Sequence, residues 1–212
     1  MKKYLLLFIF GLSCIVAKTQ TEKFNDIYKL CQAGNYNEAV LKLYSFIKAN
    51  PSHIPANYEL AKYYKKVYDQ IKGEANAKVD YILQNHSKDI KDLLECNNLY
   101  EKFTMYGDSS IYFYKKTSEF MNETYLLSNF RYKEFQITCS NMTSDVCVKN
   151  YLNTIIQMIQ DAQMKNKNDL KMIKETCSDY DKNAFENYCQ QTITDQYCSD
   201  PLLLRQILTK FG

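Results

Sequence analysis

The chain has 212 residues, and its 27 Lys and Arg against 24 Asp and Glu give a formal net charge of +3. This length suffices for one domain with a hydrophobic core or for a short array of repeats. With only 5 glycines and 3 prolines, the composition argues against a turn-rich β fold and favours long helices with short connections.

The N-terminal stretch MKKYLLLFIFGLSCIVAKTQ predicts an export signal. A basic start is followed by an apolar run that ends at Ala17. The run is shorter than the about 20 residues that a membrane-spanning helix needs. We expect residues 1–17 to be a cleaved signal peptide rather than a retained anchor or a buried first helix. Cleavage removes two basic residues and no acidic one, and this near-neutral balance gives no argument for nucleic-acid binding.

Cys14 adds an alternative to simple cleavage. It follows Ser13 near the end of the apolar run and resembles the acylated cysteine of a bacterial lipoprotein signal. Gly11 departs from that pattern, because such signals usually have Leu at this place. Acylation of Cys14 would anchor the protein to a membrane without spanning it. Otherwise Cys14 is an ordinary residue of the signal.

Residues 22–68 carry apolar side chains three and four apart, the spacing of amphipathic helices. We expect a first helix to end at Gly34, because glycine tolerates positive φ. Asn35 is a typical cap for the next helix. Asn50-Pro51 ends that helix, because a residue before proline avoids the helical region. A third helix begins near Pro55, which suits a first helical turn.

This spacing resembles the tetratricopeptide repeat (TPR). The matching residues are Gly34, Tyr36, Glu38, Ala39, Leu43 and Pro51, followed by Leu60, Ala61 and Tyr64 of the next unit. The resemblance implies antiparallel helix hairpins stacked in a right-handed solenoid, with the alanines where two helices cross most closely. Asn57 departs from the family, which often has Trp there, and the first helix lacks the usual Leu and small-residue pair. A generic helical hairpin is the alternative.

The next repeat is less regular. We expect a helix over residues 71–85 that Gly73 opens, and another over residues 88–103. A turn at Gly107-Asp108 then leads into a helix over residues 109–120. This last helix resembles a second TPR helix, with Ser110 in the position of the small residue.

Beyond residue 122 the repeat signal fades. The pattern predicts helices over residues 125–137, 144–164, 169–180, 182–192 and 201–210. Solenoids usually end in an atypical unit with a polar outer face. We therefore expect an all-α array, TPR-like over residues 18–121, with an irregular, cysteine-bearing helical cap over residues 122–212 packed on it.

Five of the eight cysteines lie from residue 139 onward. In an exported protein they suggest disulfides that join helix pairs, and we expect one or two bridges among Cys139, Cys147, Cys177, Cys189 and Cys198. Their spacings do not fit the paired cysteines of zinc sites. Cys31 lies on an apolar helical face, where a small core residue is the expected role.

Catalytic patterns are missing from the sequence. His53 and His86 are the only histidines, and both are expected to be solvated residues in or beside inter-helix turns. The sequence contains no phosphate-binding loop, nucleophile elbow or HExxH pattern. We expect no catalytic residue, no cofactor and no metal.

In TPR domains the first helix of each repeat lines a concave groove, and the resemblance places Tyr58, Lys62, Lys65 and Lys66 there. Lys62 and Lys66 are one helical turn apart. Three ammonium groups beside an aromatic ring suit an acidic peptide segment or a C-terminal carboxylate. A solvated lysine face, as charge runs usually are, or a Tyr-rich surface for helix packing are the alternatives.

The expected function is therefore that of an exported, non-catalytic TPR-like scaffold that holds a peptide or another protein of the cell envelope. We expect it in the periplasm or secreted, with no nucleic-acid partner and with membrane contact only through a lipid anchor. The first alternative is a subunit of an outer-membrane assembly anchored through Cys14. The second is an enzyme of unknown chemistry, which would need a polar pocket containing His53 or His86.

Overall fold

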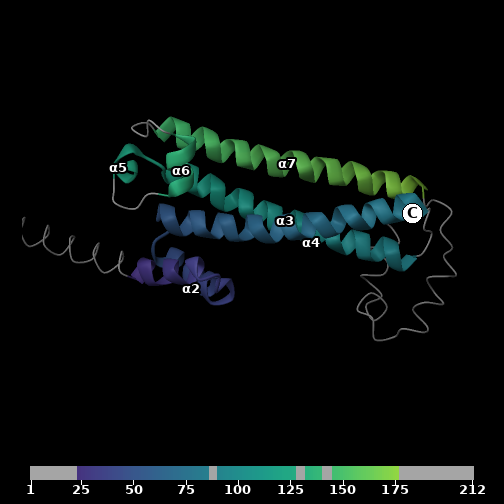
Figure 1. Ribbon diagram of the computed structural model, residues 1–212, viewed down its shortest axis with the longest axis horizontal. Coiled ribbons are helices and arrows are strands. Elements are labelled where there is room, and N and C mark those ends of the chain that lie inside the picture. The colour runs from purple at the N-terminus through teal and green to yellow at the C-terminus, as the bar shows by residue number, and fades with distance from the viewer. Residues whose placement is uncertain (1–22, 86–89, 128–131, 140–144, 177–212) are drawn as a thin grey trace, which may run out of the picture. The chain divides into compact units, whose positions relative to one another are not determined.

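The computed structural model describes residues 23–85, 90–127, 132–139 and 145–176. All regular structure in these ranges is helical, and the all-α prediction is confirmed (Figure 1). The predicted signal peptide, Cys14, His86, Cys177, Cys189, Cys198 and the helices expected beyond residue 176 lie outside the described residues. The helices are residues 23–32, α2 (Tyr36–Ala49), α3 (Ile54–Asn85), α4 (Ile90–Phe120), α5 (Glu123–Leu126), α6 (Lys133–Thr138) and α7 (Asp145–Thr176).

The chain forms two compact units, each built from segments far apart in the sequence. Among the described residues, unit 1 comprises 23–67 and 106–159, and unit 2 comprises 68–105 and 160–176. The long helices α3, α4 and α7 each contribute one part to unit 1 and another part to unit 2.

Unit 1 begins with the predicted helical hairpin. Gly34 has a φ of 76° and separates residues 23–32 from α2, because a residue with a side chain would be strained in this left-handed conformation. Ala39 is fully buried and Leu43 is 1% exposed. The end of α2 at Ala49, before Asn50-Pro51, also agrees with the prediction. The Asn35 side chain does not cap the backbone of α2, however, and donates instead to Glu38 Oε2 at 3.0 Å.

The first part of α3 packs antiparallel against the last part of α4 within unit 1. Ala61 and Ser110 are both fully buried, and Ser110 Oγ donates to the Ala61 carbonyl at 3.1 Å. Tyr58 lies against Tyr114, with 6.0 Å between ring centroids. The small side chains of Ala61 and Ser110 let the two backbones approach closely.

Unit 2 repeats this antiparallel pairing with other residues. Tyr68 of α3 stacks on Phe103 of α4, with ring centroids 4.5 Å apart. Lys78 of α3 bridges Asp92 and Glu95 of α4 at 2.7 and 2.5 Å. From α7, Gln163 Nε2 donates to the Thr104 carbonyl at 3.2 Å.

Three predicted helix breaks do not occur. Gly73 lies inside α3, Gly107 lies inside α4, and α7 continues through residues 164–169. A glycine inside a helix costs only about 1 kcal/mol relative to Ala, and Gly73 is not accompanied by a proline or a capping residue that would stop the helix. Burial of Tyr68, Ala75 and Ile82 along α3 outweighs this cost.

One predicted helix is divided instead. A single helix is expected over residues 125–137, but α5 ends at Leu126 and α6 begins at Lys133. Asn122 caps α5, because its Oδ1 accepts from Tyr125 N at 2.9 Å. Tyr132 precedes α6, is 2% exposed and donates its hydroxyl to the Pro55 carbonyl at 3.0 Å. Tyr132 therefore docks on α3 immediately before α6 begins.

Candidate functional site

The predicted concave groove is filled by the chain itself. Tyr58 is 1% exposed, with its ring centroid 4.5 Å from that of Tyr132 and 4.8 Å from that of Phe135. The expectation that Tyr58 lies on an accessible surface is therefore wrong, because α6 and the residue before it pack on this side of α3. The TPR resemblance placed Tyr58 on this side of α3 but could not show which segment covers it.

Lys62 already has acidic partners from its own chain. Its Nζ lies 2.9 Å from Glu59 Oε1 and 3.5 Å from Glu134 Oε1. It also lies 5.0 Å from the Tyr58 ring centroid and 4.8 Å from that of Tyr132, over the ring faces. Burial raises the pKa of Glu59, and although burial alone would lower the pKa of Lys62, Glu59 and Glu134 raise it. Lys62 therefore serves as the counter-ion of a buried carboxylate.

The other two predicted groove lysines differ from Lys62. Lys66 is exposed and lies 4.5 Å from the centroid of the Tyr36 ring. Lys65 is half-buried and makes an interaction of its own. Tyr36 also contacts Tyr63, with 6.0 Å between ring centroids. A partner-binding role for Lys65 and Lys66 stays a prediction.

His53 is not the solvated turn residue that the sequence suggested. Its ring centroid lies 4.6 Å from that of Phe24 and 4.8 Å from that of Phe46. His53 Nδ1 accepts from Ala56 N at 3.2 Å, so the neutral imidazole caps the start of α3. Burial lowers the pKa of His53 to about 4. The surroundings of His53 are aromatic, not the polar pocket that catalysis would need.

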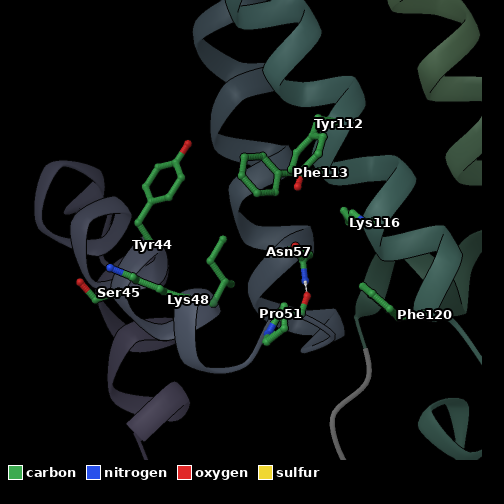
Figure 2. A pocket seen from close by; sticks show the side chains of 10 residues that line it. Tyr44, Ser45, Lys48, Pro51, Asn57, Tyr112, Phe113, Lys116 and Phe120 are labelled. Atoms are coloured by element: carbon green, nitrogen blue, oxygen red, sulfur yellow. Dashed lines mark hydrogen bonds between the residues drawn. The ribbon is translucent and has the colours of Figure 1, made fainter.

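An open groove lies elsewhere in unit 1, between α2 and α4. We call it the aromatic groove. It has a volume of about 490 Å³ and is lined by Tyr44, Ser45, Ile47, Lys48, Pro51, Asn57, Tyr112, Phe113, Lys116 and Phe120. Figure 2 shows Tyr44 and Lys48 on one side, Tyr112, Lys116 and Phe120 on the other, and Pro51 and Asn57 between them.

The walls of the aromatic groove combine exposed rings with positive charge. Tyr44 is 41% exposed and Tyr112 is 55% exposed, whereas Phe113 is buried. Tyr44 packs edge-on against Phe113 at 5.9 Å between centroids, and its hydroxyl bonds that of Tyr64. The lining contains two lysines and no carboxylate. Such a groove suits an apolar ligand that carries negative charge.

The sequence does contain a signal for the α4 wall of this groove. Tyr112, Lys116 and Phe120 are spaced by four residues, so they share one face of a helix. The TPR resemblance points only to the opposite face of residues 109–120, which Ser110 marks. The α2 wall could not have been paired with the α4 wall, because nothing local brings residues 44–48 next to residues 112–120.

A second groove of about 640 Å³ lies between residues 23–32 and α2. It contains both signs of charge, because Lys23, Lys42 and Asp26 line it. Asp26 pairs with Lys29 at 3.0 Å, and Lys42 pairs with Glu38 at 2.6 Å. This groove therefore offers less net charge to a ligand than the aromatic groove does.

One of the expected disulfides is present. Cys139 and Cys147 are bonded, with Cα atoms 5.9 Å apart, and join the end of α6 to the start of α7. Cys31 is buried, as predicted, and is a free thiol like Cys96. Burial raises the pKa of both thiols to about 11, which makes each a poor nucleophile near neutral pH.

No protein-family model, curated protein or solved structure matches the chain. Within the described ranges, no helix is both long enough and apolar enough to cross a membrane. The same ranges hold no group of three or more His, Cys, Asp or Glu side chains arranged to bind a metal ion.

Proposed function

We propose that this protein is an exported, non-catalytic scaffold of TPR-like architecture, which binds a segment of another protein in the aromatic groove. The observation that carries the proposal is the groove itself, with its exposed Tyr44 and Tyr112 and its lysine-bearing walls. Exposed aromatic rings are enriched at surfaces that bind other proteins, and the two lysines add charge complementarity for an acidic partner.

Two packing features support the TPR-like part of the proposal. The hairpin of residues 23–32 and α2 turns at a left-handed glycine, and the second pair crosses at the small residues Ala61 and Ser110. Helices α3 and α4 are much longer than one repeat requires, at 32 and 31 residues. The proposed architecture is therefore a TPR-like hairpin pair in which the helices of the second hairpin continue into unit 2.

The surroundings of His53, Glu59 and the two buried thiols support a non-catalytic role. His53 is occupied as a helix cap between two phenylalanines. Glu59 is held by Lys62 among buried aromatic residues. Cys31 and Cys96, the free thiols of the described part of the chain, are buried and have raised pKa values. None of these groups lines the aromatic groove.

Peptide display on the full mature chain tests the proposal, because a random library requires no assumption about the identity of the partner. We expect a library of short peptides to yield binders to the wild type. These binders should be lost with Tyr112→Ser, which removes an exposed groove wall. They should be retained by Tyr81→Ser, a matched control in which a tyrosine that is 50% exposed and lies outside the groove is removed.

Circular dichroism and thermal unfolding of both variants check that the fold is intact. If no peptide is enriched, or if both variants bind equally well, the aromatic groove does not bind protein segments and the proposal fails.

A further inference from the structure

The charge of the aromatic groove narrows the chemistry of its ligand. Lys48 is exposed in the last turn of α2, and within the described part of the chain it has no ion-pair partner. Lys116, on the opposite wall, forms an ion pair with Glu119, with 2.8 Å between Nζ and Oε2. With no carboxylate in the lining, Lys48 is the group most available to a negative charge brought by a ligand.

The apolar part of the groove limits the chemistry of the ligand further. Tyr44, Tyr112 and Phe120 offer ring surface on both walls, and Phe113 lies between them. A volume of about 490 Å³ falls within the range of sites that enclose a compact apolar ligand. One or two large side chains of a peptide fill such a space, with the neighbouring residues of the peptide left at the rim.

We infer that the ligand is an apolar and acidic peptide segment, whose large aliphatic or aromatic side chain enters the aromatic groove while an adjacent carboxylate binds Lys48. This inference rests on the proposed function and adds the chemistry of the partner to it. The binding face is formed by α2 and α4. The other side of α3, which carries Tyr58 and Lys62, is closed by Tyr132, Glu134 and Phe135.

The selected peptides provide the first test. We expect enriched sequences to contain Leu, Ile, Phe or Tyr within two positions of Asp or Glu. The affinity of a fluorescein-labelled representative, measured by anisotropy, should fall several-fold with Lys48→Gln and about tenfold with Lys48→Glu. It should be unchanged with Lys133→Glu, a control that makes the same charge change in the same unit outside the groove. The affinity should also fall as salt is raised, because exposed charges are screened.

A double-mutant cycle identifies the contact. Replacement of the acidic residue of the peptide by its amide should weaken binding to the wild type but cause little further loss in Lys48→Gln. Equal losses on both backgrounds would overturn the assignment of Lys48. Enrichment of neutral or basic peptides that Tyr112→Ser abolishes would overturn the inference while leaving the proposed function intact. No enrichment at all would overturn both.

Discussion

At the residue scale, Lys62 shows how the surroundings determine what a side chain does. The sequence places it in a lysine-rich stretch beside an aromatic residue, which suggested a surface for an acidic partner. In the structure that acidic partner is internal, because Glu59 and Glu134 both lie within 4 Å of the ammonium. In this position Lys62 neutralises the buried Glu59 carboxylate of its own chain.

His53 makes the stability of the protein depend on pH. Its pKa is about 4 in the folded state against 6.5 for the ordinary side chain, so the unfolded chain binds more protons between these values. The stabilisation from neutral His53 is complete above pH 6.5 and is lost as the pH falls towards 4. We expect this residue to account for a loss of about 1–2 kcal/mol between neutral pH and pH 5.

Urea unfolding of the wild type and of His53→Asn at both pH values measures this effect. Asparagine can still accept a hydrogen bond at the start of α3 but does not titrate. The carboxylates, including Glu59, contribute equally to both proteins and cancel in the comparison. An identical pH dependence in the two proteins would show that His53 is not buried as a neutral cap.

At the element scale, the continuity of α3 distinguishes this chain from a regular array of short hairpins. Gly73 was expected to open a new helix but lies within a helix of 32 residues. A methyl group at this position would meet no atom within 4 Å. Gly73→Ala should therefore stabilise the protein by about 0.5–1 kcal/mol, because alanine restricts the unfolded chain and favours the helix.

Gly34→Ala is the matched control for this prediction. Its surroundings are equally open, but its φ of 76° is strained for alanine, so we expect a loss of about 1–2 kcal/mol. Thermal unfolding of the two variants against the wild type measures both effects. A loss of stability in Gly73→Ala would mean that residue 73 lies in a turn and that α3 is interrupted there.

The disulfide fixes the connection between α6 and α7. Cys139 and Cys147 are separated by 8 residues, and closure of so short a loop is expected to contribute about 2–3 kcal/mol by restricting the unfolded chain. The double variant Cys139→Ser, Cys147→Ser should lose this amount in urea unfolding. Peptide mapping without reduction checks the pairing, and either cysteine bonded to a different residue would contradict it.

At the scale of the whole molecule, each long helix joins residues that are neighbours in the sequence but belong to different compact units. Unit 1 takes residues from the start and from the middle of the chain, and unit 2 takes residues from between and after them. Because α3 and α4 each belong to both units, no linker or change in composition marks the division. For this physical reason the boundary between the units cannot be located from the sequence.

Export is also a property of the whole chain, and it has a direct test. We expect the mature protein from its own cells to begin at Lys18, because the basic start and the apolar run of residues 1–17 have the form of a signal peptide. Intact mass and N-terminal sequencing measure this. A chain that keeps Met1 would contradict export by cleavage, and an acylated Cys14 would favour the lipid-anchored alternative.

The sequence by itself determined the features that depend on local chemistry. The left-handed turn at Gly34, the end of α2 before Pro51, the buried faces around Ala39 and Ala61, and the all-α class follow from glycine and proline geometry and from helical periodicity. The resemblance gave Ser110 the position of a small residue, but that Ser110 packs against Ala61 is a finding of the structure.

Only the tertiary structure decided which faces stay open. Periodicity shows that a helix has an apolar face, but it does not show which segment covers that face, because the contact joins residues far apart in the chain. Tyr132 is 74 residues from Tyr58 in sequence and yet covers its ring. The same long-range packing leaves Tyr44 and Tyr112 exposed on the walls of the aromatic groove, where neither residue alone gave a sign of a binding site.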